Sequence, residues 1–224
     1  MECCGTVASA ITCWKERQMG FMRTAIISAT MVIGLSAGAQ AAVIFMDDFN
    51  AENGGTGALN YAGFANWTVS GGTVDLIGNG FFDFQPGNGL YVDMDGSTSN
   101  AGKIETSASF NLIPGTLYEL SFDLAGNHRN AAQESVTVEV GAGSVLSEIF
   151  SLGQNVAFTT FTRQFSVGAA TSVTISFEGA GGDNIGMLLD NVVLSSVDVP
   201  EPATLGLLGV GLLAAPLLRR RMRR

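Results

Sequence analysis

The stretch that decides the fold is residues 118–124, which read YELSFDL. Its apolar side chains, Tyr118, Leu120, Phe122 and Leu124, alternate with the polar Glu119, Ser121 and Asp123. Successive side chains of a strand point to opposite faces, so this alternation predicts a strand with one buried and one wet face. The same pattern recurs in SVTVEV at residues 135–140 and in VTISFE at residues 173–178.

Working outward from this stretch, further strand candidates fill most of the central chain. They are residues 43–48, 67–69, 73–77, 89–94, 104–112, 147–152, 158–167 and 187–197. Clusters of Gly, Asn and Asp, such as GNHRN at 126–130, separate them, and no helical periodicity interrupts them. About ten short strands with this spacing predict an all-β fold for residues 43–198, an antiparallel β-sandwich of the jelly-roll kind.

Charge and cysteine content narrow the function of this central part. Residues 43–198 contain 17 Asp and Glu against three cations, a net charge of 3 − 17 = −14. Such a surface repels phosphate backbones, which excludes nucleic acid as a partner and favours cations or neutral ligands such as sugars. Cys3, Cys4 and Cys13 all precede residue 43, so the domain has no disulfide and no thiol chemistry.

The N-terminal residues 1–42 are predicted to be a leader and signal peptide. From Met22 the chain reads MRTAIISATMVIGLSAGAQAA, with Arg23 before a short apolar run. The small residues Ala39 and Ala41 fit a secretory signal that is cleaved after Ala41. Translation from Met19 or Met22 gives the more ordinary signal, and a buried N-terminal helix is the alternative.

The C-terminal residues 199–224 read VPEPATLGLLGVGLLAAPLLRRRMRR. Pro200, Glu201 and Pro202 precede 16 uncharged residues, 203–218, which predict a single transmembrane helix of about 24 Å. The cations that follow begin with Arg219, Arg220 and Arg221. By the positive-inside rule these arginines stay cytoplasmic, which places the acidic domain outside.

This order of motif, short helix and arginine cluster resembles the PEP-CTERM sorting signal of exopolysaccharide-producing Gram-negative bacteria. The resemblance implies an exosortase as partner, with this chain as its substrate rather than as an enzyme. It also implies export through the inner membrane, a transient membrane anchor, and final location at the cell surface or in the extracellular matrix. A plain tail anchor with incidental prolines is the alternative.

The central domain resembles galactose-binding-like carbohydrate-binding modules. The resemblance is carried by MDDFNAENGG at 46–55, Trp67, IPGTLYELSFDLAGN at 113–127 and GMLLDNVVLSSV at 186–197. It implies a jelly roll whose first and last strands lie side by side and share a structural Ca²⁺. Carried over by position, the calcium ligands are Asp48, Asn50 and Asp190. The alternative is that these are solvated polar residues at strand ends.

A ligand loop is predicted from the side chains that sugars prefer. A pyranose stacks on aromatic rings and hydrogen-bonds through its rim, and Trp67 with the loop Asn127, His128 and Arg129 offers both. The alternatives are a core position for Trp67 and an ordinary connecting turn. His128 is the only histidine and no GxSxG motif occurs, so no catalytic residue is predicted.

Together these observations predict an exported, exosortase-sorted surface or matrix protein. Its jelly-roll domain is expected to be non-catalytic and to associate with extracellular polysaccharide. Two alternatives stay open: a secreted glycoside-acting enzyme, since paired carboxylates alone can cleave glycosides, and a structural coat protein without a specific ligand.

Overall fold

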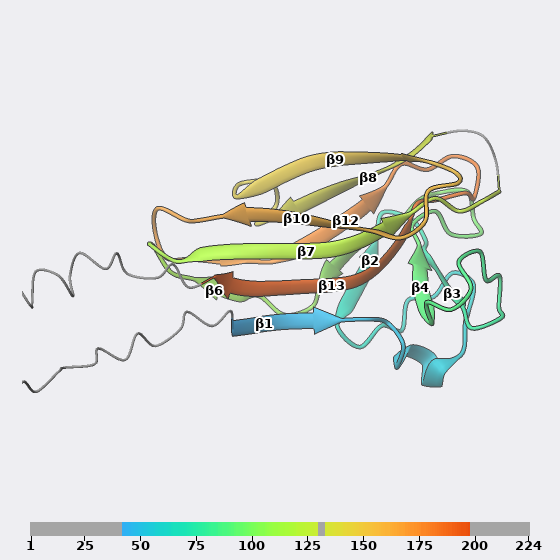
Figure 1. Ribbon diagram of the computed structural model, residues 1–224, viewed down its shortest axis with the longest axis horizontal. Coiled ribbons are helices and arrows are strands. Elements are labelled where there is room, and N and C mark those ends of the chain that lie inside the picture. Colours follow the sequence, from blue (N-terminus) through green and yellow to red (C-terminus); the bar gives the residue numbers. More distant parts are fainter. Residues whose placement is uncertain (1–41, 130–132, 198–224) are drawn as a thin grey trace, which may run out of the picture. The chain divides into compact units, whose positions relative to one another are not determined.

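The computed structural model of this protein describes residues 42–129 and 133–197 (Figure 1). Its regular elements are antiparallel strands and one short 3₁₀ helix, η1 (Glu52–Gly55). The strands are β1 (Ala42–Asp47), β2 (Trp67–Ser70), β3 (Asp75–Gly78), β4 (Leu90–Asp93), β5 (Lys103–Thr106), β6 (Phe110–Leu112), β7 (Leu117–Ala125), β8 (Gln133–Val140), β9 (Leu146–Gly153), β10 (Thr159–Phe165), β11 (Thr171–Val173), β12 (Ile175–Gly179) and β13 (Leu188–Val197).

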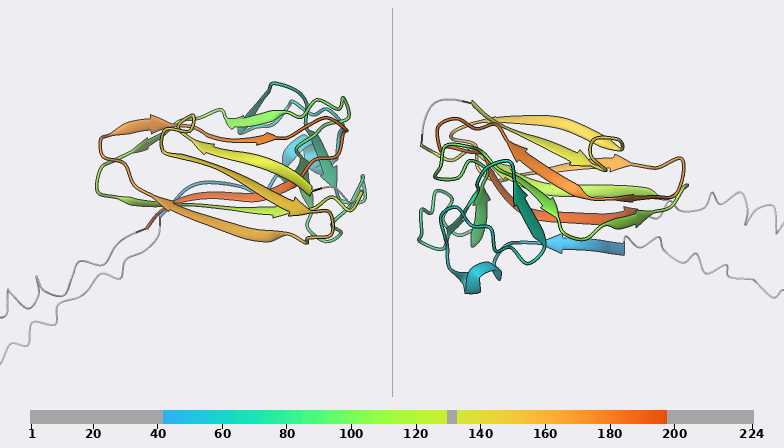
Figure 2. Two further views of the ribbon diagram at one scale, coloured as in Figure 1. Left: turned by 90° about the horizontal axis from the view of Figure 1, so that it is seen from above. Right: turned by 180° about the vertical axis from the view of Figure 1, so that it is seen from behind.

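Two large sheets pack against each other (Figures 1 and 2). The first has the order β10-β7-β13-β4-β3, with β1 also paired to β13, and the second has the order β2-β5-β12-β8-β9. A two-stranded ribbon, β11-β6, accompanies them. The predicted all-β antiparallel sandwich is therefore confirmed.

The strand that contains residues 118–124, β7, supplies the centre of the core. Its burial alternates along the strand, with the four apolar side chains buried and the polar ones between them half-buried. Phe122 makes edge-to-face contacts with Phe150 on β9 and Phe177 on β12, with ring centroids 5.2 Å apart in each case. Aromatic pairs in this geometry add to the stabilisation from burial alone, so one side chain joins the two sheets.

Two of the predicted strands are in fact broken in two. Residues 104–112 divide into β5, which pairs with β2 and β12, and β6, which pairs with β11. Residues 173–178 divide between β11 and β12 in the same way. The alternation of side chains continues across such a break, because it depends on local backbone geometry and not on which strand is the partner.

The first and last strands lie side by side, as the resemblance implied. β1 runs antiparallel to β13, from Ala42 opposite Ser196 to Asp47 opposite Val192. The signal cleavage site at Ala39 and Ala41, the motif Pro200-Glu201-Pro202, the predicted transmembrane helix 203–218 and the arginine cluster lie outside the described residues. Within 42–129 and 133–197, no helix has the length and apolar character to cross a membrane.

Candidate ligand-binding site

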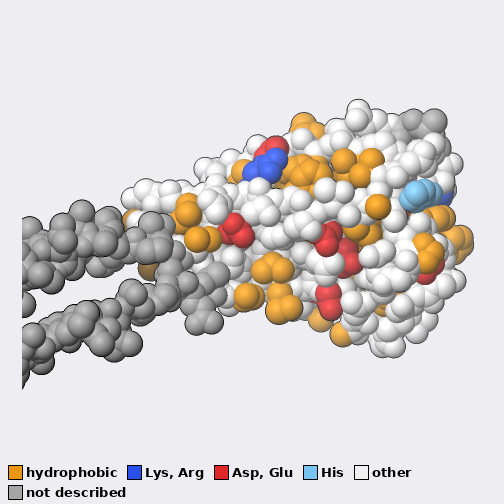
Figure 3. All heavy atoms as spheres, in the orientation of Figure 1, with side chains coloured by type: hydrophobic (Ala, Val, Ile, Leu, Met, Phe, Trp, Pro, Cys, Tyr) orange, Lys and Arg blue, Asp and Glu red, His pale blue; other side chains and the backbone are white. Residues whose placement is uncertain are grey.

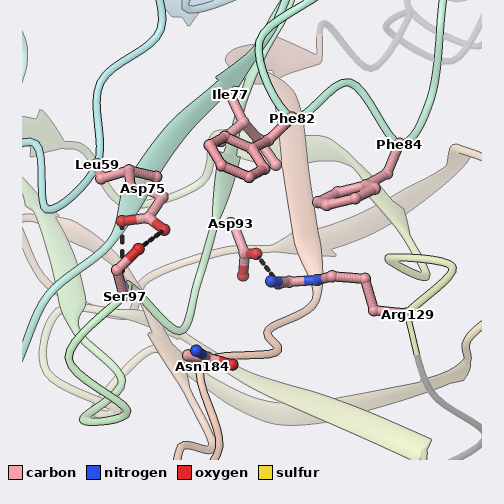
Figure 4. Close-up of a pocket in the computed structure, with 9 residues that line it drawn as sticks. All are labelled: Leu59, Asp75, Ile77, Phe82, Phe84, Asp93, Ser97, Arg129 and Asn184. Atoms are coloured by element: carbon pink, nitrogen blue, oxygen red, sulfur yellow. Dashed lines mark hydrogen bonds and ion pairs between the residues drawn. The ribbon is translucent and has the colours of Figure 1, made fainter.

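A cavity of about 230 Å³ lies between strands β3 and β4 and the loops around them (Figure 4). Residues from several strands and loops, far apart in the sequence, line it. They are Leu59, Asp75, Ile77, Phe82, Phe84, Asp93, Ser97, Arg129 and Asn184. The cavity therefore combines carboxylates, a guanidinium, an amide and two phenylalanine rings.

Two buried carboxylates form the polar centre of the cavity. Asp75 on β3 and Asp93 on β4 stand directly opposite in the antiparallel register, and they are 5% and 1% exposed. Asp75 accepts three hydrogen bonds: Oδ1 from the amides of Asn60 (2.6 Å) and Ser97 (3.2 Å), and Oδ2 from the Ser97 hydroxyl (2.8 Å). This carboxylate is therefore fixed by the segment before β3 and by the loop after β4.

Asp93 is fixed equally firmly and pairs with the cation of the cavity. Its Oδ1 accepts hydrogen bonds from the amides of Asp95 (3.2 Å) and Gly186 (2.9 Å), and its Oδ2 accepts one from Arg129. Burial raises the pKa of the Asp93 carboxyl to about 8, against the opposing effects of Arg129 and the two amides; Asp75 raises it further. The Arg129 guanidinium also lies 4.8 Å from the centre of the Phe84 ring, within cation–π range.

The aromatic wall belongs to the loop of residues 79–89 between β3 and β4. Phe82 on this loop is 53% exposed, and Phe84 is half-buried beside Arg129. The loop is anchored from below by Tyr91, which is fully buried: its hydroxyl donates to Asp83 (3.0 Å) and accepts from the Gln85 amide (2.9 Å). Burial raises the pKa of Tyr91, so it stays a neutral hydrogen-bond donor.

The opposite wall is the loop before β13, which carries Asn184. Asp95, fully buried, holds this loop through Oδ2, which accepts hydrogen bonds from the backbone amides of Gly182 (3.1 Å), Asp183 (3.3 Å) and Asn184 (3.1 Å). The other oxygen, Oδ1, is buried without a hydrogen-bond partner among the described residues. Asp95 thus positions one wall of the cavity without lining it.

This set of groups suits a hydroxyl-rich ring. Exposed aromatic faces can stack on the apolar face of a sugar, while carboxylate oxygens accept and guanidinium and amide nitrogens donate to its hydroxyls. Both carboxylates are already engaged by backbone or side-chain donors that hold them in place. The arrangement therefore offers an apolar face together with polar groups that are held in fixed positions.

Of the predicted ligand loop, only Arg129 lines the cavity. Asn127 is 1% exposed and is a structural residue, because its side chain donates to the Gly186 carbonyl (2.6 Å) and accepts from the Arg129 amide (3.0 Å). His128 is exposed (pale blue in Figure 3), and its Nε2 atom lies 2.9 Å from the side-chain nitrogen of Gln85. It is not among the residues that line the cavity. The turn thus presents one side chain to the cavity instead of three.

The prediction that Trp67 faces a ligand is wrong. Its side chain is 2% exposed and packs in the core against Phe45 and Phe49, with ring centroids 5.5 and 5.9 Å away. Its indole nitrogen donates to Asp47 Oδ2 at 2.9 Å. The ring therefore packs β2 against the first strand, β1, and the alternative of a core position for Trp67 is correct.

Of the three predicted calcium ligands, Asp48 and Asp190 are close enough to interact, whereas the side chain of Asn50 has another partner. Asp48 and Asp190 interact electrostatically, but the Asn50 side-chain oxygen accepts a hydrogen bond from the Leu90 amide at 2.9 Å. Asp48 uses one oxygen to accept from the Asn50 amide at 3.1 Å. In residues 42–129 and 133–197, no three Asp, Glu, His or Cys side chains are arranged to hold a metal ion. The described side chains thus do not fit the full ligand set, and calcium stays a prediction.

A comparison of Asp190→Asn with the wild type tests this prediction. Burial raises the pKa of Asp190 to about 7, with Asp123, Asp48 and Asp47 adding to the rise. A raised pKa in the folded state means that this group costs stability as the pH rises from about 4 to about 7, at about 1.4 kcal/mol for each pKa unit. In chelator, melting curves are expected to show the variant gaining stability relative to the wild type over this range.

If calcium binds, the wild type is expected to be the more stable of the two proteins when calcium is present. If the ion binds there, millimolar calcium raises the melting temperature of the wild type and Asp190→Asn abolishes the rise, because a carboxylate ligand is lost. Equal wild-type melting temperatures in calcium and in chelator would remove the calcium hypothesis. A flat difference between the two proteins from pH 4 to pH 8 would contradict the raised pKa.

Sequence reasoning missed most of the cavity. Asp75 and Asp93 lay inside the predicted strands 73–77 and 89–94, so neither was singled out as a site residue. One signal was available: residues 81–84 read FFDF beside PGNG, and a turn-rich loop cannot bury three aromatic rings in so short a span. Tyr91 and Tyr118 offer no stacking surface for a ligand, since they are 0% and 3% exposed.

The fold is an antiparallel β-sandwich, and a cavity with a polar and aromatic lining lies among the loops of one of its sheets. The chain belongs to the family described as "Protein of unknown function (DUF642)", which matches residues 49–195. Residues 198–224 match the PEP-CTERM protein-sorting motif, as predicted, which indicates export and exosortase-mediated sorting to the surface. Among curated proteins, none matches this chain.

Solved structures with a similar fold include carbohydrate-binding modules and an adhesin domain. The CBM22-1-CBM22-2 tandem of Paenibacillus barcinonensis Xyn10C has 18% identity and a TM-score of 0.47, covering 74% of this chain and 48% of that one. The K1 cleaved adhesin domain of Lys-gingipain from Porphyromonas gingivalis has 12% identity and a TM-score of 0.46, covering 69% and 97%. The CBM22-1-GH10 modules of Clostridium thermocellum xylanase 10B have 14% identity and a TM-score of 0.42; the match covers 68% of this chain and 28% of the xylanase.

Proposed function

We propose that this chain is a non-catalytic surface or extracellular-matrix protein whose β-sandwich binds a polysaccharide in the cavity between β3 and β4. The observation that carries the proposal is the exposed Phe82 ring beside the fixed pair of Asp93 and Arg129. Sugar sites need an apolar surface for the ring face and polar groups for the rim, held rigid so that little ordering is needed on binding.

The acidic surface favours a neutral glycan over an anionic polymer as the ligand. On the face drawn in Figure 3, acidic side chains are spread over the strands and few cations accompany them. All three cations in residues 43–198 are engaged in ion pairs: Arg129 with Asp93, Arg163 with Glu148, and Lys103 with Glu105 and Glu139. A domain with this field repels polyanions at long range.

Sorting to the surface supports the same function. The PEP-CTERM motif at residues 198–224 is a sorting signal, and exosortase processing would deliver the sandwich to the matrix in which polysaccharides are found. Under this proposal the transmembrane segment that the sequence predicts at 203–218 anchors the chain only until processing, and the polysaccharide contact then keeps the domain at the surface.

A glycan-binding assay on the full chain tests the function. Retardation in native gels that contain neutral polysaccharides is expected for the wild type, and Phe82→Ala is expected to weaken it about tenfold, because stacking on an aromatic ring contributes on the order of 1 kcal/mol. Ile149→Ala, which trims a side chain that is 68% exposed and outside the cavity, serves as the matched control. Retention on none of a wide panel of glycans would favour a structural coat protein instead.

A separate measurement of reducing sugar, on the same proteins and polysaccharides, distinguishes binding from hydrolysis. A release of reducing sugar that disappears in Asp75→Asn or Asp93→Asn would support the glycoside-acting enzyme. We expect no such release, since both carboxylates are held by donors.

Sorting is tested separately by Glu201→Ala. The wild type is expected to appear as a processed species outside the membrane, whereas the variant stays full-length in the membrane fraction, because the motif between Pro200 and Pro202 is altered. Fractionation followed by immunoblotting gives the result. Identical distributions of the two proteins would count against exosortase sorting and in favour of a plain tail anchor.

A further inference from the structure

The charge state of the cavity depends on how Arg129 is held. Among its lining residues, Arg129 is the one cation, and its guanidinium lies between the Asp93 carboxylate and the Phe84 ring (Figure 4). The side chain of Arg129 is 27% exposed, whereas that of Asp93 is 2% exposed. A ligand in the cavity can therefore reach the guanidinium, but its charge is already matched by a buried partner.

Asp93 cannot easily release Arg129. Its Oδ1 is fixed by two backbone amides from Asp95 and Gly186, which orients Oδ2 toward the guanidinium. A carboxylate on a ligand would have to compete with this preorganised pair, and it would also face Asp75 across the β3-β4 register. Like charges in a poorly solvated site repel strongly, so an anionic ligand gains little there.

The size of the cavity defines how much of a glycan it holds. At about 230 Å³ it is smaller than the cavities of roughly 300–1,000 Å³ that enclose drug-sized ligands. It accommodates one sugar ring with its substituents, and simple glycosides are therefore adequate probes.

We infer that Asp93 is the specificity-determining residue of the cavity: by holding Arg129 in an ion pair, it makes the cavity accept a neutral sugar ring and reject the matching uronic acid. This inference rests on the proposed function and names the chemical class of its ligand. The neutral sugar and its uronate differ at a single carbon, which carries a hydroxymethyl group in one and a carboxylate in the other, so charge is the main difference between them. A site that leaves one charge unpaired discriminates far more strongly than one that loses an apolar contact.

The preference for a neutral sugar requires Asp93 to be ionised. The charged groups that act on Asp93 are Arg129, which lowers its pKa, and Asp75, which raises it, and burial brings the pKa to about 8. At pH 9, above this pKa, the carboxylate is therefore the main form of Asp93. As the pH falls through about 8 the carboxyl is protonated, Arg129 loses its counter-charge, and the preference for the neutral sugar is expected to weaken.

The test uses the full chain and matched pairs of glycosides at pH 9. The probes are the methyl glycosides of glucose, galactose and mannose and those of the corresponding uronic acids, titrated while chemical shifts are recorded by NMR. For the sugar that binds, the wild type is expected to bind the neutral glycoside at least tenfold more tightly than its uronate. In Asp93→Asn the ratio is expected to fall at least tenfold, because Arg129 becomes available to the uronate while the amide oxygen still accepts from Asp95 and Gly186.

The outcomes separate the two claims. Glu119→Gln, which removes an acid on β7 outside the cavity, is the matched control and is expected to keep the wild-type ratio. Binding by the wild type with no preference for the neutral member, or an unchanged ratio in a folded Asp93→Asn, would overturn the inference and leave the proposed function standing. Binding of neither member of any pair, together with no retention on polysaccharides, would overturn both.

Discussion

A Trp67→Ala variant is expected to lose about 3–5 kcal/mol of its free energy of unfolding, since a large buried aromatic side chain is removed from a packed core. The indole contacts Phe45, Phe49 and Phe177 through their rings, so the cavity left behind opens where the first strand and both sheets meet. Asp47 would also lose the indole donor to its Oδ2. Urea unfolding followed by circular dichroism measures the loss.

Two substitutions make this result specific. Trp67→Phe keeps most of the apolar volume and removes the donor together with a smaller part of the ring system, and it is expected to cost about 1–3 kcal/mol. Phe82→Ala, at an exposed ring of the cavity, is expected to leave the stability within about 0.5 kcal/mol. A Trp67→Ala protein as stable as the wild type would show that Trp67 is not a core residue and would restore its predicted place on a ligand face.

The second large effect is expected for Asp95→Ala, which should lower the free energy of unfolding by about 3 kcal/mol. A hydrogen bond to a charged acceptor stabilises a fold more than a hydrogen bond to a neutral acceptor does. Three consecutive amides, from Gly182 to Asn184, lose their common acceptor. Since Asn184 lines the cavity, glycan retention is expected to fall together with stability. Thermal melting and native gels on the same samples measure both.

Asp95→Asn is the informative companion. The amide keeps one acceptor oxygen for the three backbone donors, and the buried Oδ1, which has no partner among the described residues, is replaced by or exchanged with a neutral group. Most of the stability and of the glycan retention should therefore survive. A loss equal to that of the alanine variant would mean that the charge of Asp95, and not its hydrogen bonds, holds the loop.

The sequence predicted those features that depend on neighbouring residues of one strand, and it did not predict those that depend on pairing between distant strands. The alternation at residues 118–124 predicted β7 and the position of its apolar side chains in the core, because period two is a property of one strand and its faces. The breaks within 104–112 and 173–178 were missed for the same reason, since a change of partner leaves that period intact. Glycine and Asn-rich clusters located the turns, yet they did not show which turn side chains point inward.

By itself, the sequence determined the fold class, the acidic and cysteine-free character of the domain and the sorting motif at residues 198–224, all of which are local patterns of residues. Only the tertiary structure decided that Trp67 is buried and that Asp75, Asp93 and Arg129 share one cavity. Asp93 and Arg129 are 36 residues apart and meet through strand register and the loop hydrogen bonds of Asn127. Such proximity arises from non-local pairing between strands, which no period in the sequence encodes.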